Sequence, residues 1–162
     1  MKNLLFLCLI MLSANLFAQT SGVKLYNPGA NAEKDITEAL KKARLENKHV
    51  FIQAGGNWCY WCLEFNRFTK SEKQIDSMIH SDFVVYHLNY SPENKNVALF
   101  TKYGFPQRFG FPVFIILDAN GNRIHTQNSG YLEQGKSYNK RKIIEFLGHW
   151  NRQSIDQQMY KK

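Results

Sequence analysis

Two cysteines stand at a spacing that suits redox chemistry. Cys59 and Cys62 enclose Tyr60 and Trp61 in a C-x-x-C motif, which follows an expected strand and opens an expected helix. Unpaired backbone N–H groups and the helix dipole favour a thiolate at a helix N-terminus, so Cys59 is the expected nucleophile. Cys62, one turn further into the helix and more buried, can then attack the mixed disulfide and release the partner.

Other uses of a cysteine pair fit the sequence less well. A structural zinc site needs four ligands, but there is no second cysteine pair and the five histidines are scattered. Covalent haem attachment needs a histidine directly after the second cysteine, where Leu63 stands. A purely structural disulfide stays open, although so small a loop would contribute little entropy to stability. We therefore expect a reactive pair that uses no metal or cofactor.

The composition fits one folded domain. The 162 residues carry 21 Lys and Arg against 13 Asp and Glu, a formal charge of +8, and 44% of them are hydrophobic. This apolar fraction excludes an intrinsically disordered chain. The basic residues form short runs, such as residues 140–142, and no nucleic-acid-binding module is visible, so no nucleic acid is expected as a partner. A solvated basic surface can still steer acidic partner proteins.

The N-terminus has the features of a secretory signal peptide. Lys2 precedes an apolar run at residues 4–12, and small residues follow up to Ala18, after which cleavage is expected. The run is shorter than the ~20 residues that span a membrane. We therefore expect export to the periplasm and a soluble mature protein without stable membrane insertion. The expected division is a signal peptide at residues 1–18, a lead-in at 19–34, one domain at 35–151 and a polar tail at 152–162.

Apolar periodicity predicts alternating helices and strands. The expected helices lie at residues 35–47, 59–69, 71–79, 97–103 and 138–151, and the expected strands at 49–54, 83–88, 112–117 and 123–127. Helices between the early strands indicate parallel crossovers, whereas an Asn120-Gly121 turn makes the last two strands antiparallel. This order predicts an α/β fold with a mixed central sheet of about four to five strands and helices on both faces.

Two segments together resemble the thioredoxin superfamily. Residues 51–62, FIQAGGNWCYWC, are similar to that family's strand and active-site turn. Residues 110–116, GFPVFII, are similar to the segment that carries the family's cis-proline. The resemblance covers about residues 35–150 and extends to exported members, including the C-terminal domain of the thiol:disulfide interchange reductase. It implies a thioredoxin-like fold, and it gives Cys59 and Cys62 the same two roles as their spacing does.

The resemblance also implies a substrate-binding site. It makes Pro112 a cis-proline that sits against the disulfide, and it lets the backbone of Phe111 pair with an extended substrate segment. The competing interpretation is that Pro112 simply starts an edge strand. Trp58, Tyr60 and Trp61 either form an apolar docking surface with Phe111 or pack against the sheet, and the sequence favours neither.

Two departures from the family pattern bear on the mechanism. Gln53 stands where many members have a buried carboxylate that accepts the proton of the buried thiol, and an amide cannot accept it. Proton transfer is then expected through water or through Glu64, unless Glu64 is a solvated helix residue. The pair Tyr60-Trp61 contains no Pro or His between the cysteines, which favours a reducing or moderate potential.

These features predict an exported thiol-disulfide oxidoreductase. Its expected partners are cysteine-containing protein substrates and a separate thiol electron donor, and a monomer is expected. Two alternatives stay open. The first is a disulfide isomerase or oxidase, which the reduction potential would separate from a reductant. The second is a non-catalytic binding module, which is compatible with an amide at Gln53.

Overall fold

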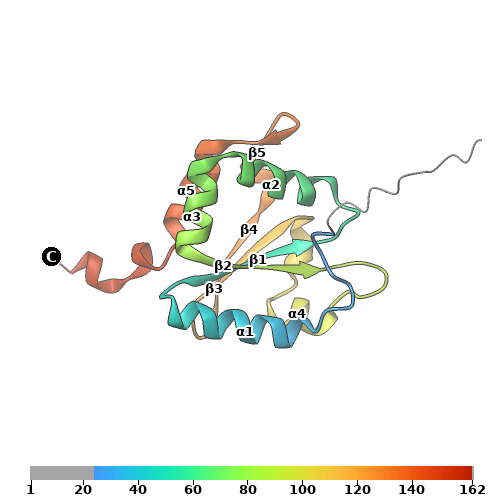
Figure 1. The fold of residues 1–162 in the computed structure, drawn as a ribbon, viewed down its shortest axis with the longest axis horizontal. Helices are drawn as coiled ribbons and strands as arrows, with labels where there is room; N and C mark the ends of the chain where they lie inside the picture. The colour runs from blue at the N-terminus through green and yellow to red at the C-terminus, as the bar shows by residue number, and fades with distance from the viewer. Residues whose placement is uncertain (1–23, 162) are drawn as a thin grey trace, which may run out of the picture.

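The computed structural model describes residues 24–161. The expected signal peptide at residues 1–18 lies outside the described residues. Figure 1 shows a twisted sheet with helices on both faces, and its four strands follow the order β2-β1-β3-β4. The predicted α/β fold with a mixed central sheet is confirmed. No helix within residues 24–161 is long and apolar enough to cross a membrane.

The secondary structure lies close to the predicted ranges. The sheet consists of β1 (His49–Gly55), β2 (Phe83–Asn89), β3 (Val113–Leu117) and β4 (Arg123–Asn128). The helices are α1 (Ala32–Leu45), α2 (Tyr60–Ser71), α3 (Lys73–Asp82), α4 (Val97–Lys102) and α5 (Lys140–Trp150). Short 3₁₀ helices are η1 (Pro106–Phe109), η2 (Ser129–Leu132), η3 (Gln153–Ile155) and η4 (Gln157–Tyr160).

Two helix starts differ from the sequence prediction because asparagines cap them. Asn31 accepts a hydrogen bond from the backbone N–H of Lys34, so α1 begins before the predicted residue 35. Asn139 caps α5 in the same way. Tyr138, predicted as the first residue of this helix, therefore lies in a small hairpin of β5 (Glu133–Gln134) and β6 (Ser137–Tyr138). Strands of two residues show no periodicity in the sequence, so this hairpin was not predicted.

One strand direction also differs from the prediction. β1 and β2 are parallel, as expected, but β3 runs antiparallel to β1. A crossover helix must carry the chain back along a seven-residue strand, roughly 23 Å, whereas the six-residue helix α4 spans roughly 9 Å. The rest of residues 90–112 lies in turns and η1, and the chain re-enters the sheet at the end where β2 stops. This return sets Val113 opposite Ala54, beside the end of β1.

Two apolar clusters hold the helices on the sheet. Successive strand side chains alternate between the faces, so Val50 and Ile52 pack against α1 and α4, whereas Phe51 packs against α2, α3 and α5. The same division is visible in Figure 1, where α1 and α4 lie below the sheet. Both central strands, β1 and β3, are buried along their whole length. The end of β1 is thereby a rigid platform for the cysteine turn.

Candidate active site

The cysteine pair forms a disulfide where α2 begins. Cys59 is the N-cap residue of α2, and its Sγ accepts a hydrogen bond from the backbone N–H of Cys62 at 3.2 Å. Cys62 lies in the first helical turn and is fully buried, while Cys59 is 5% exposed. Cys59 therefore stands at the helix N-terminus and Cys62 deeper in the protein, which are the places the sequence predicts for them.

The loop before β3 reaches the disulfide from the neighbouring strand. The Phe111–Pro112 peptide bond is cis and Pro112 is buried. Phe111 packs against the cluster that contains both cysteines, and its ring lies edge-on to that of Trp58 with centroids 5.6 Å apart. The antiparallel return of β3 is what brings this loop to the end of β1.

The aromatic residues around the disulfide divide into two groups. Trp58 is 58% exposed and Tyr60 is 61% exposed, so both present apolar surface beside the cysteines. The indole N–H of Trp58 donates to the carbonyl oxygen of Tyr90 at 2.8 Å, which fixes the ring over the loop after β2. Trp61, by contrast, is partly buried. It packs against the cluster that contains both cysteines and against the apolar cluster between the sheet and α2, α3 and α5. Packing into the core thus applies to Trp61, whereas the exposure of Trp58 and Tyr60 leaves a docking surface there as a prediction.

A groove adjoins Trp58. It has a volume of about 650 Å³ and lies between the active-site turn, the lead-in segment and the loop after β2. Its lining residues are Lys24, Pro28, Asn57, Trp58, Asn89, Tyr90, Ser91, Pro92, Glu93 and Lys95. The groove meets the active-site turn at Asn57 and Trp58, and neither cysteine lines it.

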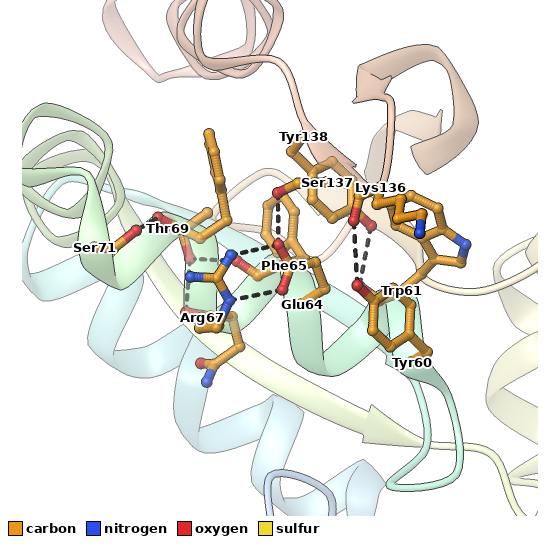
Figure 2. Close-up of polar contacts among 12 residues, drawn as sticks. Tyr60, Trp61, Glu64, Phe65, Arg67, Thr69, Ser71, Lys136, Ser137 and Tyr138 are labelled. Atoms are coloured by element: carbon orange, nitrogen blue, oxygen red, sulfur yellow. Dashed lines mark hydrogen bonds and ion pairs between the residues drawn. The ribbon is translucent and has the colours of Figure 1, made fainter.

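The β5–β6 hairpin is bonded to the first turn of α2. Figure 2 shows Tyr138 and Lys136 facing Tyr60 and Trp61. The hydroxyl of Tyr138 donates to the carbonyl oxygen of Trp61 at 3.0 Å. The hydroxyl of Tyr60 donates to the carbonyl oxygen of Lys136 at 3.2 Å. The two residues between the cysteines are therefore held by a segment far along the chain.

Glu64 makes a second contact with this hairpin and is buried beneath it. Its carboxylate accepts hydrogen bonds from Nε and Nη2 of Arg67 at 2.7 and 2.6 Å, and from the hydroxyl of Ser137 at 2.5 Å (Figure 2). The bonds from Arg67 lower the pKa of Glu64 below its usual range. Glu64 is only 8% exposed, so the interpretation as a solvated helix residue is wrong. The hairpin covers it, which periodicity within α2 does not reveal.

Gln53 and Tyr26 lie beneath the disulfide. The Nε2 of Gln53 donates to the carbonyl oxygen of Cys62 and to the hydroxyl of Tyr26, both at 2.8 Å. Asn57 holds the backbone of Tyr26 from both sides, since its Oδ1 accepts from the Tyr26 N–H at 3.0 Å and its Nδ2 donates to the Tyr26 carbonyl at 2.7 Å. Sequence reasoning missed Tyr26, because no local spacing connects the lead-in segment with the cysteine turn.

The fold and the site define a class of protein. A CxxC disulfide at a helix N-terminus, set at the end of a central strand and next to a cis-proline loop, is the arrangement of thioredoxin-like proteins. The model of the thioredoxin-like domain family matches residues 36–140, and the chain belongs to this family. This membership and the Cys59–Cys62 disulfide confirm the prediction of a thiol-disulfide oxidoreductase.

Solved structures share the fold at low sequence identity. A disulphide isomerase from Xylella fastidiosa Temecula1 superposes with a TM-score of 0.66 and 22% identity, over 76% of this chain and 93% of that one. The oxidised C-terminal domain of DsbD from Neisseria meningitidis gives 0.53 and 18%, over 75% and 97%. A DsbH oxidoreductase gives 0.53 and 18%, over 69% and 78%. No curated protein matches the chain.

Proposed function

We propose that this protein is exported to the periplasm and, as a monomer, reduces disulfides in cysteine-containing proteins. The observation that carries the proposal is the asymmetry of the cysteine pair. The sulfur of Cys59 stands at the N-terminus of α2 and accepts a backbone N–H, whereas Cys62 is fully buried. Helix N-termini stabilise thiolates. Cys59 is therefore the nucleophile and Cys62 the resolving thiol.

The dithiol form acts in two displacements. The Cys59 thiolate attacks one sulfur of the partner's disulfide, forming a mixed disulfide and releasing one partner thiol. Cys62 then loses its proton and attacks the sulfur of Cys59, which forms the Cys59–Cys62 disulfide and releases the second partner thiol. Two electrons pass to the partner in this sequence. A separate thiol donor reduces the protein again.

We assign substrate binding to the aromatic residues and the loop around the disulfide. Trp58 and Tyr60 are exposed there, and Phe111 packs against the cysteines and Trp58. Pro112 holds the Phe111 backbone beside the disulfide, where it can pair with an extended substrate segment. Trp61 contributes by fixing the turn rather than by exposed surface.

Insulin reduction by the protein without residues 1–18 tests the activity. The Cys59→Ser variant is expected to lose turnover, because no thiolate remains to attack the substrate. The Cys62→Ser variant is expected to accumulate mixed disulfides with partner proteins, which non-reducing gels resolve. Equal turnover in the Cys59→Ser variant would contradict the proposal. If the parent shows no turnover and a variant with both Cys59→Ser and Cys62→Ser still binds the partner, the protein would instead be a binding module.

Isomerase activity is the second candidate, and the similar Xylella fastidiosa structure bears the name of a disulphide isomerase. Equilibration with glutathione separates the two directions. A reduction potential below about −230 mV supports a reductant, and one near −120 to −180 mV supports an isomerase or oxidase. Export is tested separately by the mass of the protein recovered from the periplasm, which is expected to begin at Gln19.

A further inference from the structure

Tyr26 is placed to act on the resolving cysteine. It is fully buried and packs with Cys59 and Cys62 in one small cluster. A Cβ added to Gly55 would clash with the Sγ of Cys62 and would lie 3.0 Å from the hydroxyl oxygen of Tyr26. The sulfur and the hydroxyl therefore both border the same side of Gly55.

Gln53 determines which way the Tyr26 hydroxyl points its proton. The carbonyl oxygen of Cys62 can only accept, so the amide nitrogen of Gln53 must face it. The second N–H of that nitrogen then donates to Tyr26, whose oxygen is the acceptor. The O–H of Tyr26 is left to find another acceptor, and a buried donor without one is costly. The sulfur of Cys62 is nearby, because a Cβ on Gly55 would approach both this sulfur and the Tyr26 hydroxyl.

Near this site His87 and Tyr138 stay neutral, Glu64 is already engaged, and Lys70 is a cation beside His87. The ring of His87 lies edge-on to Tyr26 with centroids 5.6 Å apart, and burial lowers the pKa of His87 to about 4. Burial also raises the pKa of Tyr26 and of Tyr138 far above the neutral range. Glu64 is held by Arg67 and Ser137. Lys70 is the cation that faces His87 from α2.

We infer that the Tyr26 hydroxyl, oriented by Gln53, donates a hydrogen bond to the Cys62 sulfur in the dithiol form and stabilises its thiolate for the resolving step. This inference rests on the proposed function. The thiol proton leaves to water, and Tyr26 keeps its own proton, so it is a positioning residue. A cavity of about 240 Å³ between α2, α3 and β2 is lined by Gln53, so space for water reaches the residue that holds the Cys62 carbonyl. Tyr26 thus supplies part of what a buried carboxylate would supply at position 53.

The test isolates the resolving step. Reduced protein attacks 5,5′-dithiobis(2-nitrobenzoate) through Cys59, and release of the second chromophore reports the attack by Cys62. The Tyr26→Phe variant keeps the ring and removes the hydroxyl. Loss of a hydrogen bond to a charged group is expected to slow this release about tenfold at pH 7 and to move its pH profile upward by about one unit.

A matched control and a second variant keep the test decisive. Tyr103 is also a buried tyrosine, and its hydroxyl has no partner among residues 24–161, so Tyr103→Phe is expected to leave the profile unchanged. Gln53→Met, which removes the amide that orients the hydroxyl, is expected to shift the profile in the same direction as Tyr26→Phe.

Two results would overturn the inference. One is an unshifted pH profile in a folded Tyr26→Phe protein, and the other is a rate that falls equally at every pH, which would indicate a purely structural role. If Tyr26→Phe fails to fold, an unshifted profile in Gln53→Met overturns the inference in its place. The profile does not depend on insulin turnover, so failure of the proposed function would be recognised separately.

Discussion

Gly55 lies so close to the sulfur of Cys62 that the two leave no room for a side chain. A Cβ at position 55 would clash with this sulfur and approach the Tyr26 hydroxyl. The close approach comes from the last residue of β1 meeting the first turn of α2. The requirement for glycine here is therefore steric and belongs to the redox site.

We expect Gly55→Ala to destabilise the oxidised protein. The added methyl group must displace Cys62 or Tyr26, and overpacking of a buried site costs about 2 kcal/mol in the free energy of unfolding. Urea denaturation measures this change. Gly148→Ala is the matched control, because nothing lies within 4 Å of its Cβ in α5, and it is expected to stabilise the protein by about 0.5–1 kcal/mol. Equal effects of the two substitutions would refute the steric explanation.

Tyr138→Phe is expected to loosen the turn between the cysteines. The substitution removes the donor to the carbonyl oxygen of Trp61 and leaves that carbonyl without this partner. The expected loss in the free energy of unfolding is about 1–2 kcal/mol, again measured with urea. Tyr131→Phe, at a side chain that is 72% exposed, is expected to change the stability little. A similar small effect in Tyr138→Phe would show that the hairpin does not support the turn.

The Glu64–Arg67 pair is expected to stabilise the protein in a pH-dependent way. Hydrogen bonds from Arg67 lower the pKa of Glu64 below its ordinary value of 4.5, so the unfolded state binds protons more readily at acidic pH. The stabilisation is fully present above about pH 5 and is lost as the pH falls through the folded-state pKa. Glu64→Gln is therefore expected to cost roughly 1 kcal/mol at pH 7.

Denaturation curves between pH 3 and pH 7 test this dependence. The difference between the parent and Glu64→Gln is expected to shrink below the ordinary pKa of 4.5. Glu145→Gln removes an exposed partner of Arg141 in α5 and is expected to give a much smaller difference at every pH. A constant difference for Glu64→Gln would contradict the assigned ion pair.

His87 is expected to destabilise the folded protein in acid. Burial lowers its pKa from 6.5 to about 4, so between these values the unfolded state takes up a proton that the folded state refuses. The free energy of unfolding should therefore fall by about 2 kcal/mol as the pH drops from 6.5 to 4. His87→Gln should make this slope less steep by the same amount, while His80→Gln, at an exposed side chain in α3, should keep it. A slope as steep in His87→Gln as in the parent would assign this loss of stability to other groups.

Much of the redox site follows from local sequence. The strand that ends at Gly55, the helix that begins after Cys59 and the spacing of the two cysteines each depend on neighbouring residues. Strand alternation and helix N-termini are short-range effects, so composition and spacing predict them. The family resemblance added the cis-proline loop at Pro112, whose peptide bond is indeed cis.

The surroundings of the site depend on contacts between distant segments. The direction of β3 depends on how far the short helix α4 carries the chain, and the burial of Glu64 depends on a hairpin that the periodicity did not show. Tyr26 reaches Cys62 only because Asn57 fixes the lead-in segment against the active-site turn.

The sequence by itself therefore determined the chemistry of this protein, a cysteine pair at the start of a helix after a buried strand. Only the tertiary structure decided which polar groups surround the resolving cysteine. Hydrogen bonds such as that between Gln53 and Tyr26 join residues far apart in the chain. No short-range periodicity specifies such a bond, because packing of the whole sheet and its helices brings the two groups together.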